Sequence, residues 1–162
     1  LTEIHSQAEA FVATLADRFK AGEAATGHGG AAFLIDYGFP EGEYFHPQRH
    51  MGTLMCHQLH KSDTDPLQDV GAKDITAHVN FTGVALAAQD AGLHVLGYTT
   101  QAHFLINCGL LPPLVDAPVA EKAMAQKLIT EHEMGELFKV VALGTSEWEP
   151  MGFAQGDRSH TL

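Results

Sequence analysis

The chain has 162 residues and a mass of 17.4 kDa, which is enough for one globular domain and too little for two. Hydrophobic residues make up 45% and charged residues 18%, so the composition can fill a core and excludes a disordered chain. The formal net charge of −11 excludes the basic surface that nucleic acid or an anionic membrane requires. No apolar run approaches the roughly 18 residues of a membrane span, and two cysteines are too few for a disulfide framework.

The first elements in chain order are a helix and a strand. Apolar residues recur every three or four positions over residues 4–20, which predicts an amphipathic helix that Thr2 caps and Gly22 ends. The glycine-rich segment 27–30 precedes the next apolar run, whereas a nucleotide-binding loop follows a strand. We therefore interpret it as a connection. The apolar run 31–36 predicts a strand that is covered on both faces.

Residues 39–79 are expected to form a long excursion with little regular structure. Three prolines, Pro40, Pro47 and Pro66, interrupt the segment among many His and Asp residues. Residues 53–56 are its one candidate strand. Excursions of this length in compact domains are usually functional or partly disordered.

Regular structure is expected again from Asn80, which can cap a helix over residues 80–91. Further elements are predicted as a strand at 93–98, helices at 102–110 and 121–133 with a break at Pro112-Pro113 between them, and a strand at 137–143. Residues 144–162 are expected to be irregular. The alternation of helices and strands favours an α/β fold with a largely parallel sheet.

Several polar residues lie at positions where chemistry is expected. Asp36 ends the first predicted strand, where ligands of open α/β sheets bind, although it could equally cap a turn before Gly38. Capping accounts for Asn80 but leaves Asp74 and His78, just before it, unexplained. Arg49 is one of few cations in an acidic chain and is a natural partner for a carboxylate.

A histidine-rich segment also has potential ligands for a metal ion: His46, His50, Cys56, His57 and His60. Pro47 lies within the first His pair, and the spacing matches no established metal framework. We therefore assign no metal ligand. Two alternatives for loop 46–60 stay open, a metal-dependent hydrolase and a non-catalytic module that binds a partner.

Six stretches of the chain, in order and over nearly its whole length, resemble the MidA family of S-adenosylmethionine-dependent methyltransferases. They are FLIDYG at 33–38, EYFHPQR at 43–49, GTLMC at 52–56, DITAHVNF at 74–81, GYTTQ at 97–101 and MGELFKV at 134–140. The family includes bacterial members and the mitochondrial complex I assembly factor that methylates a protein arginine. Asn80 stands where the family more often has Asp, and both residues cap helices.

The resemblance implies a fold and a cofactor. The fold is the C-terminal portion of a class I, Rossmann-like methyltransferase sheet: strands five to seven, the last antiparallel, with flanking helices and a long inserted loop at about 39–79. Residues 1–162 are then the C-terminal part of a single domain. The cofactor, S-adenosyl-L-methionine, would be bound mainly by an N-terminal half, so no residue of this chain is assigned to it. Because the chain begins Leu1-Thr2 without Met, we expect a part of a longer protein that is inactive alone.

The resemblance also implies a substrate-facing wall. We expect catalytic roles for Asp36, Asp74 and His78, and substrate-binding roles for Tyr37, Tyr44, His46 and Arg49. Carboxylates would orient a guanidinium acceptor, aromatic rings would cover it, and His78 would take up a proton. The expected partners are a protein substrate and either the missing half or a second copy. A bacterial member would be cytoplasmic, and only a eukaryotic one mitochondrial.

Overall fold

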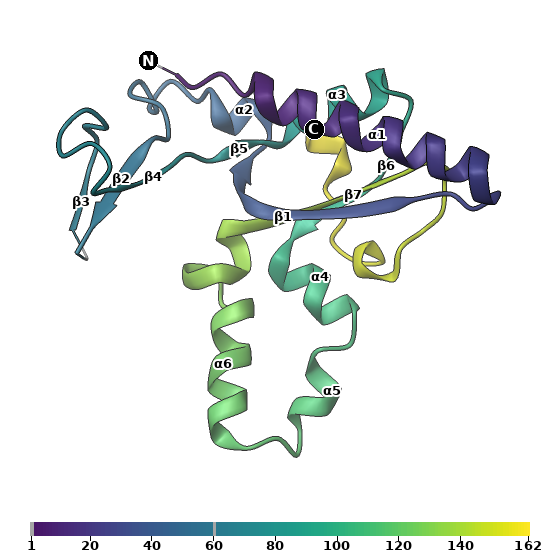
Figure 1. Cartoon of the computed structure of the whole chain (residues 1–162). Helices are drawn as coiled ribbons and strands as arrows, with labels where there is room; N and C mark the ends of the chain where they lie inside the picture. The colour runs from purple at the N-terminus through teal and green to yellow at the C-terminus, as the bar shows by residue number, and fades with distance from the viewer. Residues whose placement is uncertain (1, 60) are drawn as a thin grey trace.

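A four-stranded mixed sheet lies at the centre of the computed structural model, which describes residues 2–59 and 61–162 (Figure 1). Its strands, in the order β5-β1-β7-β6, are β5 Val79–Asn80, β1 Ala31–Phe39, β7 Phe138–Gly144 and β6 His94–Thr100. Strand β7 is antiparallel to both β1 and β6, whereas β5 pairs in parallel with β1. The α/β class is confirmed. The sheet is mixed: β5, β1 and β6 run in one direction, and β7, which lies between β1 and β6, runs antiparallel to them.

Two helices, α1 Ser6–Thr26 and α3 Phe81–Asp90, cover one face of this sheet (Figure 1). The main core forms between them and the strands, from Val12, Ala16, Phe81, Val84, Ala88, Leu93, Tyr98, Val141 and Leu143. Burying each large apolar side chain of this core contributes about 1.5–3 kcal/mol. The core therefore packs α1 and α3 against the sheet. It also fixes the position of the sheet edge at which β1 and β6 both end.

The ends of α1 differ from the prediction. The helix begins at Ser6 with His5 at the N-cap, so Thr2 does not cap it, and it continues past Gly22 to Thr26. A glycine inside a helix costs only about 1 kcal/mol, which tertiary packing overrides. Gly27 ends the helix because its φ of 72° is left-handed and its N–H donates to the Glu23 carbonyl. Asn80 caps α3 as predicted, since its side chain accepts the Gly83 N–H.

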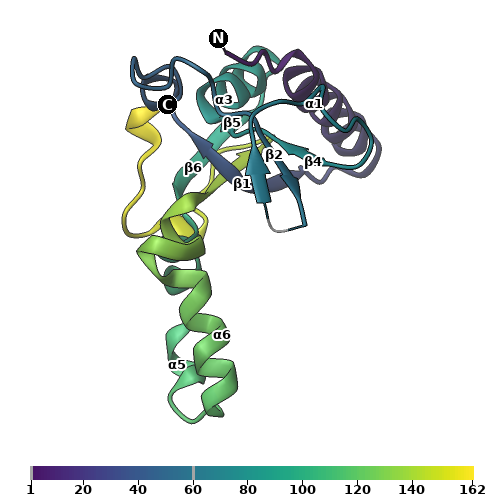
Figure 2. The same cartoon turned by 90° about the vertical axis from the view of Figure 1, so that its left-hand side faces the viewer.

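A helical arm projects from the opposite side of the sheet (Figures 1 and 2). It consists of α4 Gln101–Asn107, α5 Leu111–Leu114 and α6 Val119–Ile129, followed by the turn η1 Glu131–Gly135. The predicted break at Pro112-Pro113 is instead a short helix, because a first helical turn needs no N–H from proline. The predicted helix 121–133 ends at Ile129. No helix of the described residues is long and apolar enough to cross a membrane.

The excursion after β1 contains more regular structure than expected. It has a short helix, α2 Glu41–Tyr44, and a small antiparallel sheet in the order β3-β2-β4, with strands β2 Met55–Gln58, β3 Lys61–Asp63 and β4 Asp74–Thr76. The predicted strand 53–56 overlaps the start of β2, whereas β3 and β4, each of three exposed residues, carry no apolar alternation and are missed by the sequence pattern. The C-terminal segment contains the 3₁₀ turns η2 Met151–Phe153 and η3 Ser159–Thr161.

Replacing Gly38 with alanine should lower the free energy of unfolding by about 1–3 kcal/mol, because an added methyl group would overpack the junction of β1, β5 and α3. A Cβ at this position would meet the Val79 carbonyl oxygen and the Phe81 ring. Urea denaturation measures the loss. Gly42→Ala on α2 is the control, since a Cβ there meets nothing within 4 Å. Equal stabilities of the two variants would contradict this packing.

Candidate functional site

Four side chains gather where β1 ends, and we call Tyr37, Phe39, Arg49 and His78 the His78 cluster. The His78 ring stacks on Phe39 with centroids 5.0 Å apart and an interplanar angle of 22°. The Tyr37 ring lies 6.2 Å from the His78 ring. The Arg49 guanidinium carbon is 3.9 Å from the centroid of Phe39. Three of the predicted site residues, Tyr37, Arg49 and His78, are therefore neighbours.

Local structure explains this gathering. Alternation along β1 places Tyr37 and Phe39 on one face of the sheet. The parallel pairing of β5 with the end of β1 brings His78 beside them, and the His78 N–H donates to the Thr53 hydroxyl at 2.9 Å. The Arg49 Nε donates to the Glu43 carbonyl at 3.0 Å, which fixes the guanidinium over Phe39.

The surroundings of His78 favour the neutral form of its imidazole. Partial burial lowers the pKa of His78 below its ordinary value of 6.5, and the positive charge of Arg49 lowers it further, while Asp36 and Glu3 oppose the shift. A neutral imidazole has a free ring nitrogen that can accept a proton at neutral pH. The geometry thus supplies a base beside two aromatic rings and a guanidinium.

NMR titration of the His78 ring should give a midpoint below 6.5. Arg49→Gln should raise the pKa because it removes a positive charge, and Asp36→Asn should lower it further. Since the pKa is lower in the folded chain, the unfolded chain takes up the proton first. Stability should therefore fall as pH drops from about 6.5 to the folded pKa. An unshifted midpoint, or one insensitive to both changes, would contradict this electrostatic arrangement.

Asp36 lies at the same end of β1 but outside the aromatic stack. Its carboxylate accepts the Tyr37 N–H at 2.8 Å, and its backbone pairs in register with Lys139 of β7. The side chain is exposed, yet close enough to His78 to influence its pKa. The catalytic role of Asp36 stays a prediction, and His78 is the site residue on which its charge acts.

Two other predicted residues lie apart from the stack. Asp74 is exposed on β4 of the small sheet, in register with His57, and within the described residues no hydrogen bond or ion pair joins it to His78. His46 is exposed, and its Nδ1 accepts the Gln48 N–H at 3.3 Å. Together with Glu43, Gln48 and Arg49 it lines an open cavity of about 420 Å³. His46 therefore shares a cavity with Arg49 of the His78 cluster, whereas Asp74 lies on the separate small sheet.

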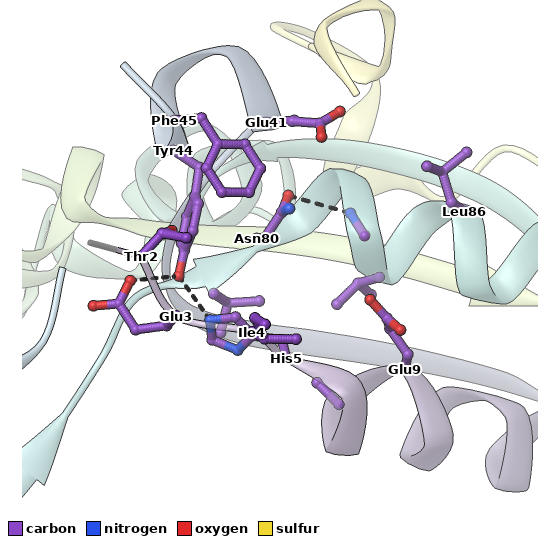
Figure 3. Close-up of a pocket in the computed structure, with 14 residues that line it drawn as sticks. Thr2, Glu3, Ile4, His5, Glu9, Glu41, Tyr44, Phe45, Asn80 and Leu86 are labelled. Atoms are coloured by element: carbon purple, nitrogen blue, oxygen red, sulfur yellow. Dashed lines mark hydrogen bonds between the residues drawn. The ribbon is translucent and has the colours of Figure 1, made fainter. Parts of the chain in front are cut away.

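Tyr44 lies in a second cavity, of about 300 Å³, between the N-terminal segment, α2 and α3 (Figure 3). Its hydroxyl bonds to Glu3 at 3.1 Å and to His5 at 2.7 Å, and burial with the Glu3 charge raises its pKa to about 12. The other Glu3 oxygen accepts the N–H groups of Thr53 and Leu54. Glu3 thus joins both Tyr44 and the loop before β2 to the N-terminal segment, and the predicted contact of Tyr44 with substrate stays a prediction.

Sequence reasoning missed a group of charged residues around the buried Lys139 of β7. The Glu136 carboxylate is 2.8 Å from the Arg158 guanidinium and 3.8 Å from the Lys139 ammonium. Lys139 is buried, and the Tyr98 hydroxyl is buried without a hydrogen bond among the described residues. Both residues stand in apolar segments that the sequence predicts as strands, and neither is assigned a role from the sequence. A lysine within the apolar run 137–143 is the signal that could have found them.

The structure gives the metal hypothesis no support. Within residues 2–59 and 61–162, no group of three or more His, Cys, Asp and Glu side chains is placed to hold an ion. Cys56 is buried on β2 while the adjacent His57 is exposed, so the two point in opposite directions. His60, which also belonged to that hypothesis, lies outside the described residues.

Comparisons with known proteins agree with one another. A family model described as "Putative S-adenosyl-L-methionine-dependent methyltransferase" matches residues 1–99. A native structure of an uncharacterized COG1565 superfamily protein from Burkholderia thailandensis superposes with a TM-score of 0.90 and 46% identity, over 99% of this chain and 43% of its own. A superfamily member from the same organism, described as a "likely methyl transferase" bound to S-adenosyl-homocysteine, has a TM-score of 0.87 and 46% identity over 99% of this chain and 42% of its own. The chain thus spans less than half the length of these structures. No curated protein matches it.

Proposed function

Because the chain belongs to this family of S-adenosyl-L-methionine-dependent methyltransferases, we propose that it forms the acceptor-binding part of an enzyme that methylates a nitrogen group, the guanidinium of a protein arginine. The His78 cluster is the observation that carries the proposal. It places a neutral base, two aromatic rings and a fixed cation at the end of β1. This is the edge at which open α/β sheets bind their ligands.

The residues of the cluster would have distinct tasks in this reaction. The cofactor supplies an activated methyl group, so the protein mainly aligns the acceptor and excludes water. The partly exposed ring of Tyr37 would cover a planar guanidinium, while Phe39 holds His78 and Arg49 in place. A guanidinium nitrogen that gains a methyl group must release one proton. The neutral imidazole of His78 is placed to accept it, and Asp36 would stabilise the resulting imidazolium.

We propose that the cofactor is held mainly outside this chain. A glycine-rich connection from strand to helix lets the backbone approach a bound nucleoside. Among the described residues, the connection from β1 to α2 contains Pro40, and β6 passes directly into α4 at Gln101. Neither has a glycine. The residues present therefore fit an acceptor site and do not by themselves build a cofactor site. We also propose that the assembled enzyme works in a bacterial cytoplasm.

The edge of β1 is the surface on which we propose that the cofactor-binding part docks. Residues 31–37 pair with β7 on one side and with no described strand on the other. Phe33 and Ile35 are 43% and 48% exposed. A groove of about 290 Å³ that includes Phe11 runs between α1 and this edge. An apolar strand from the cofactor-binding part would satisfy the free backbone groups and cover these side chains.

The proposal is tested by mixing the chain with the remaining part of the Burkholderia thailandensis protein and supplying S-adenosyl-L-methionine with a labelled methyl group. Arginine peptides should be methylated by the pair and by neither part alone, and lysine peptides should be modified far less. Mass spectrometry locates the methyl group. Transfer to an oxygen or carbon acceptor would contradict the proposal, and assembly without any transfer would favour a non-catalytic partner-binding role.

A further inference from the structure

The carboxylate of Glu3 fills a backbone turn just before β2. One of its oxygens, Oε1, accepts the N–H of Thr53 at 2.7 Å and the N–H of Leu54 at 2.6 Å. Among the described residues, no other group accepts these two N–H groups. Successive backbone N–H groups next to a residue in the left-handed conformation form a concavity that binds an anion. The chain supplies that anion itself, from a residue 50 positions before Thr53.

Gly52 is the residue that lets the carboxylate approach this turn. Its φ of 77° lies in the left-handed region, which glycine adopts without strain. A Cβ at this position would also meet the carboxylate oxygens of Glu3. Both the backbone conformation and the missing side chain of Gly52 therefore suit a turn that is built around Glu3.

The second oxygen of Glu3 is held on the other side, next to the cavity of Figure 3. The buried Tyr44 hydroxyl donates to Oε2 at 3.1 Å, and the His5 Nε2 lies 2.7 Å from the same hydroxyl. Although burial raises the pKa of the Glu3 carboxyl, the hydrogen bonds that it accepts outweigh burial, and the pKa lies below 4.5. Glu3 is therefore charged at neutral pH.

The turn that Glu3 fills lies between two members of the His78 cluster. On one side, the Gly52 N–H donates to the Arg49 carbonyl at 2.9 Å. On the other side, the Thr53 hydroxyl accepts the His78 N–H at 2.9 Å. Fixing this turn therefore fixes the backbone of both residues and, with it, where the guanidinium and the imidazole lie relative to each other.

We propose that Glu3 is a positioning residue of the acceptor site: its carboxylate holds the turn at residues 52–54 and thereby keeps His78 where it can accept the proton. This inference rests on the proposed function and adds a residue from outside the His78 cluster. No hydrogen bond joins Glu3 to His78 in the described part of the chain, so Glu3 acts through the turn. A displacement of about 1 Å at a reacting group can cost roughly 100-fold in rate.

NMR of the 162-residue chain tests this positioning without any methyl transfer. In Glu3→Ala, the amide resonances of Thr53 and Leu54 should shift, and both amides should exchange with solvent about 10-fold faster or more, because each loses a hydrogen bond to a charged group. Glu9→Ala is the matched control. It removes an exposed carboxylate from the same cavity that has no bond to the turn, so it should change neither amide.

The titration midpoint of His78 distinguishes position from charge. Glu3 favours the imidazolium, so the loss of its charge alone would lower the pKa of His78 further. A displaced His78 is instead more exposed and farther from Arg49, and both changes raise its pKa towards 6.5. We expect the midpoint to rise in Glu3→Ala. Thr53→Val, which removes only the hydroxyl that accepts the His78 N–H, should raise it too and serves if Glu3→Ala does not fold.

Two rescue experiments separate the carboxylate from the rest of the side chain. Sodium acetate should return the amides and the His78 midpoint of Glu3→Ala towards their wild-type values, because acetate can occupy the turn. Sodium chloride at the same ionic strength should not. Glu3→Gln keeps an oxygen that accepts both N–H groups and should stay close to the wild type.

Wild-type amides in Glu3→Ala would overturn the proposal, as would a His78 midpoint that falls or stays unchanged in Glu3→Ala and Thr53→Val, or equal effects of acetate and chloride. In the assembled enzyme, Glu3→Ala should lower kcat for an arginine peptide by about 10- to 100-fold, with a far smaller change in KM. If the NMR results are as expected but no methyl group is transferred to arginine, the positioning stands and the proposed function fails. If arginine is methylated and Glu3→Ala keeps the wild-type kcat, the proposed function stands and the positioning fails.

Discussion

Replacing His78 with asparagine should lower the rate constant of methyl transfer in the assembled enzyme by about 10²- to 10⁴-fold, the usual contribution of a general base. The change removes the ring nitrogen that accepts the proton but keeps a polar side chain of similar size. The backbone N–H of His78, which donates to the Thr53 hydroxyl, is kept in this variant and should preserve the segment. KM for an arginine peptide should change far less than kcat.

The pH profile distinguishes a base from a merely structural residue. The acidic limb of kcat/KM should follow the lowered pKa of His78, and Arg49→Gln should move that limb to higher pH. His160→Asn, an exposed change in η3, is the matched control and should leave the profile unaltered. A His78→Asn enzyme with wild-type kcat would exclude His78 as the base.

Replacing Ile35 with lysine should weaken the assembly of this chain with the cofactor-binding part by at least about 100-fold, because burying an unpaired charge costs several kcal/mol and each 1.4 kcal/mol is tenfold in affinity. Ile35 is 48% exposed in the chain alone, so its own stability should hardly change. Analytical ultracentrifugation of the mixture measures the loss. Val119→Lys is the control, since Val119 is 84% exposed on the arm and far from this edge in sequence.

Ile35→Pro tests the backbone part of the same contact. The Tyr37 N–H bonds to the Asp36 carboxylate and so points away from β7, and alternation gives the Ile35 N–H the same direction. Proline removes that donor from the free edge and leaves the ladder to β7 intact. Assembly of both variants with wild-type affinity would show that the cofactor-binding part docks elsewhere.

The apolar elements of the fold could be predicted because their sequence patterns are strong. The run before Asp36, the cap at Asn80 and the run before Gly144 each predict the element that forms there. Strands β3 and β4 could not be predicted, because they are short, exposed and held by pairing with β2, which the predicted strand 53–56 overlaps only at its start. Helix ends were also missed, since α1 continues through Gly22 under the packing of its neighbours.

The candidate site was predictable only in part, and mainly from the resemblance. The resemblance implied roles for Tyr37, Arg49 and His78 on one wall of the site. The pairing of β5 with β1 brings these residues together. Asp74 is four residues from His78 in sequence but belongs to a different sheet. The ring of Tyr98 belongs to the core, and only the three-dimensional placement reveals that its hydroxyl has no hydrogen-bond partner among the described residues.

Isothermal titration with S-adenosyl-homocysteine tests most directly whether this chain is the acceptor-binding part of a methyltransferase. The titration is made on the chain alone, on the remaining part of the Burkholderia thailandensis protein, and on the mixture of the two. We expect no measurable binding to the chain alone and one binding site in the mixture, lost when Ile35→Lys prevents assembly. Stoichiometric binding of S-adenosyl-homocysteine to the isolated chain would contradict this division of the enzyme.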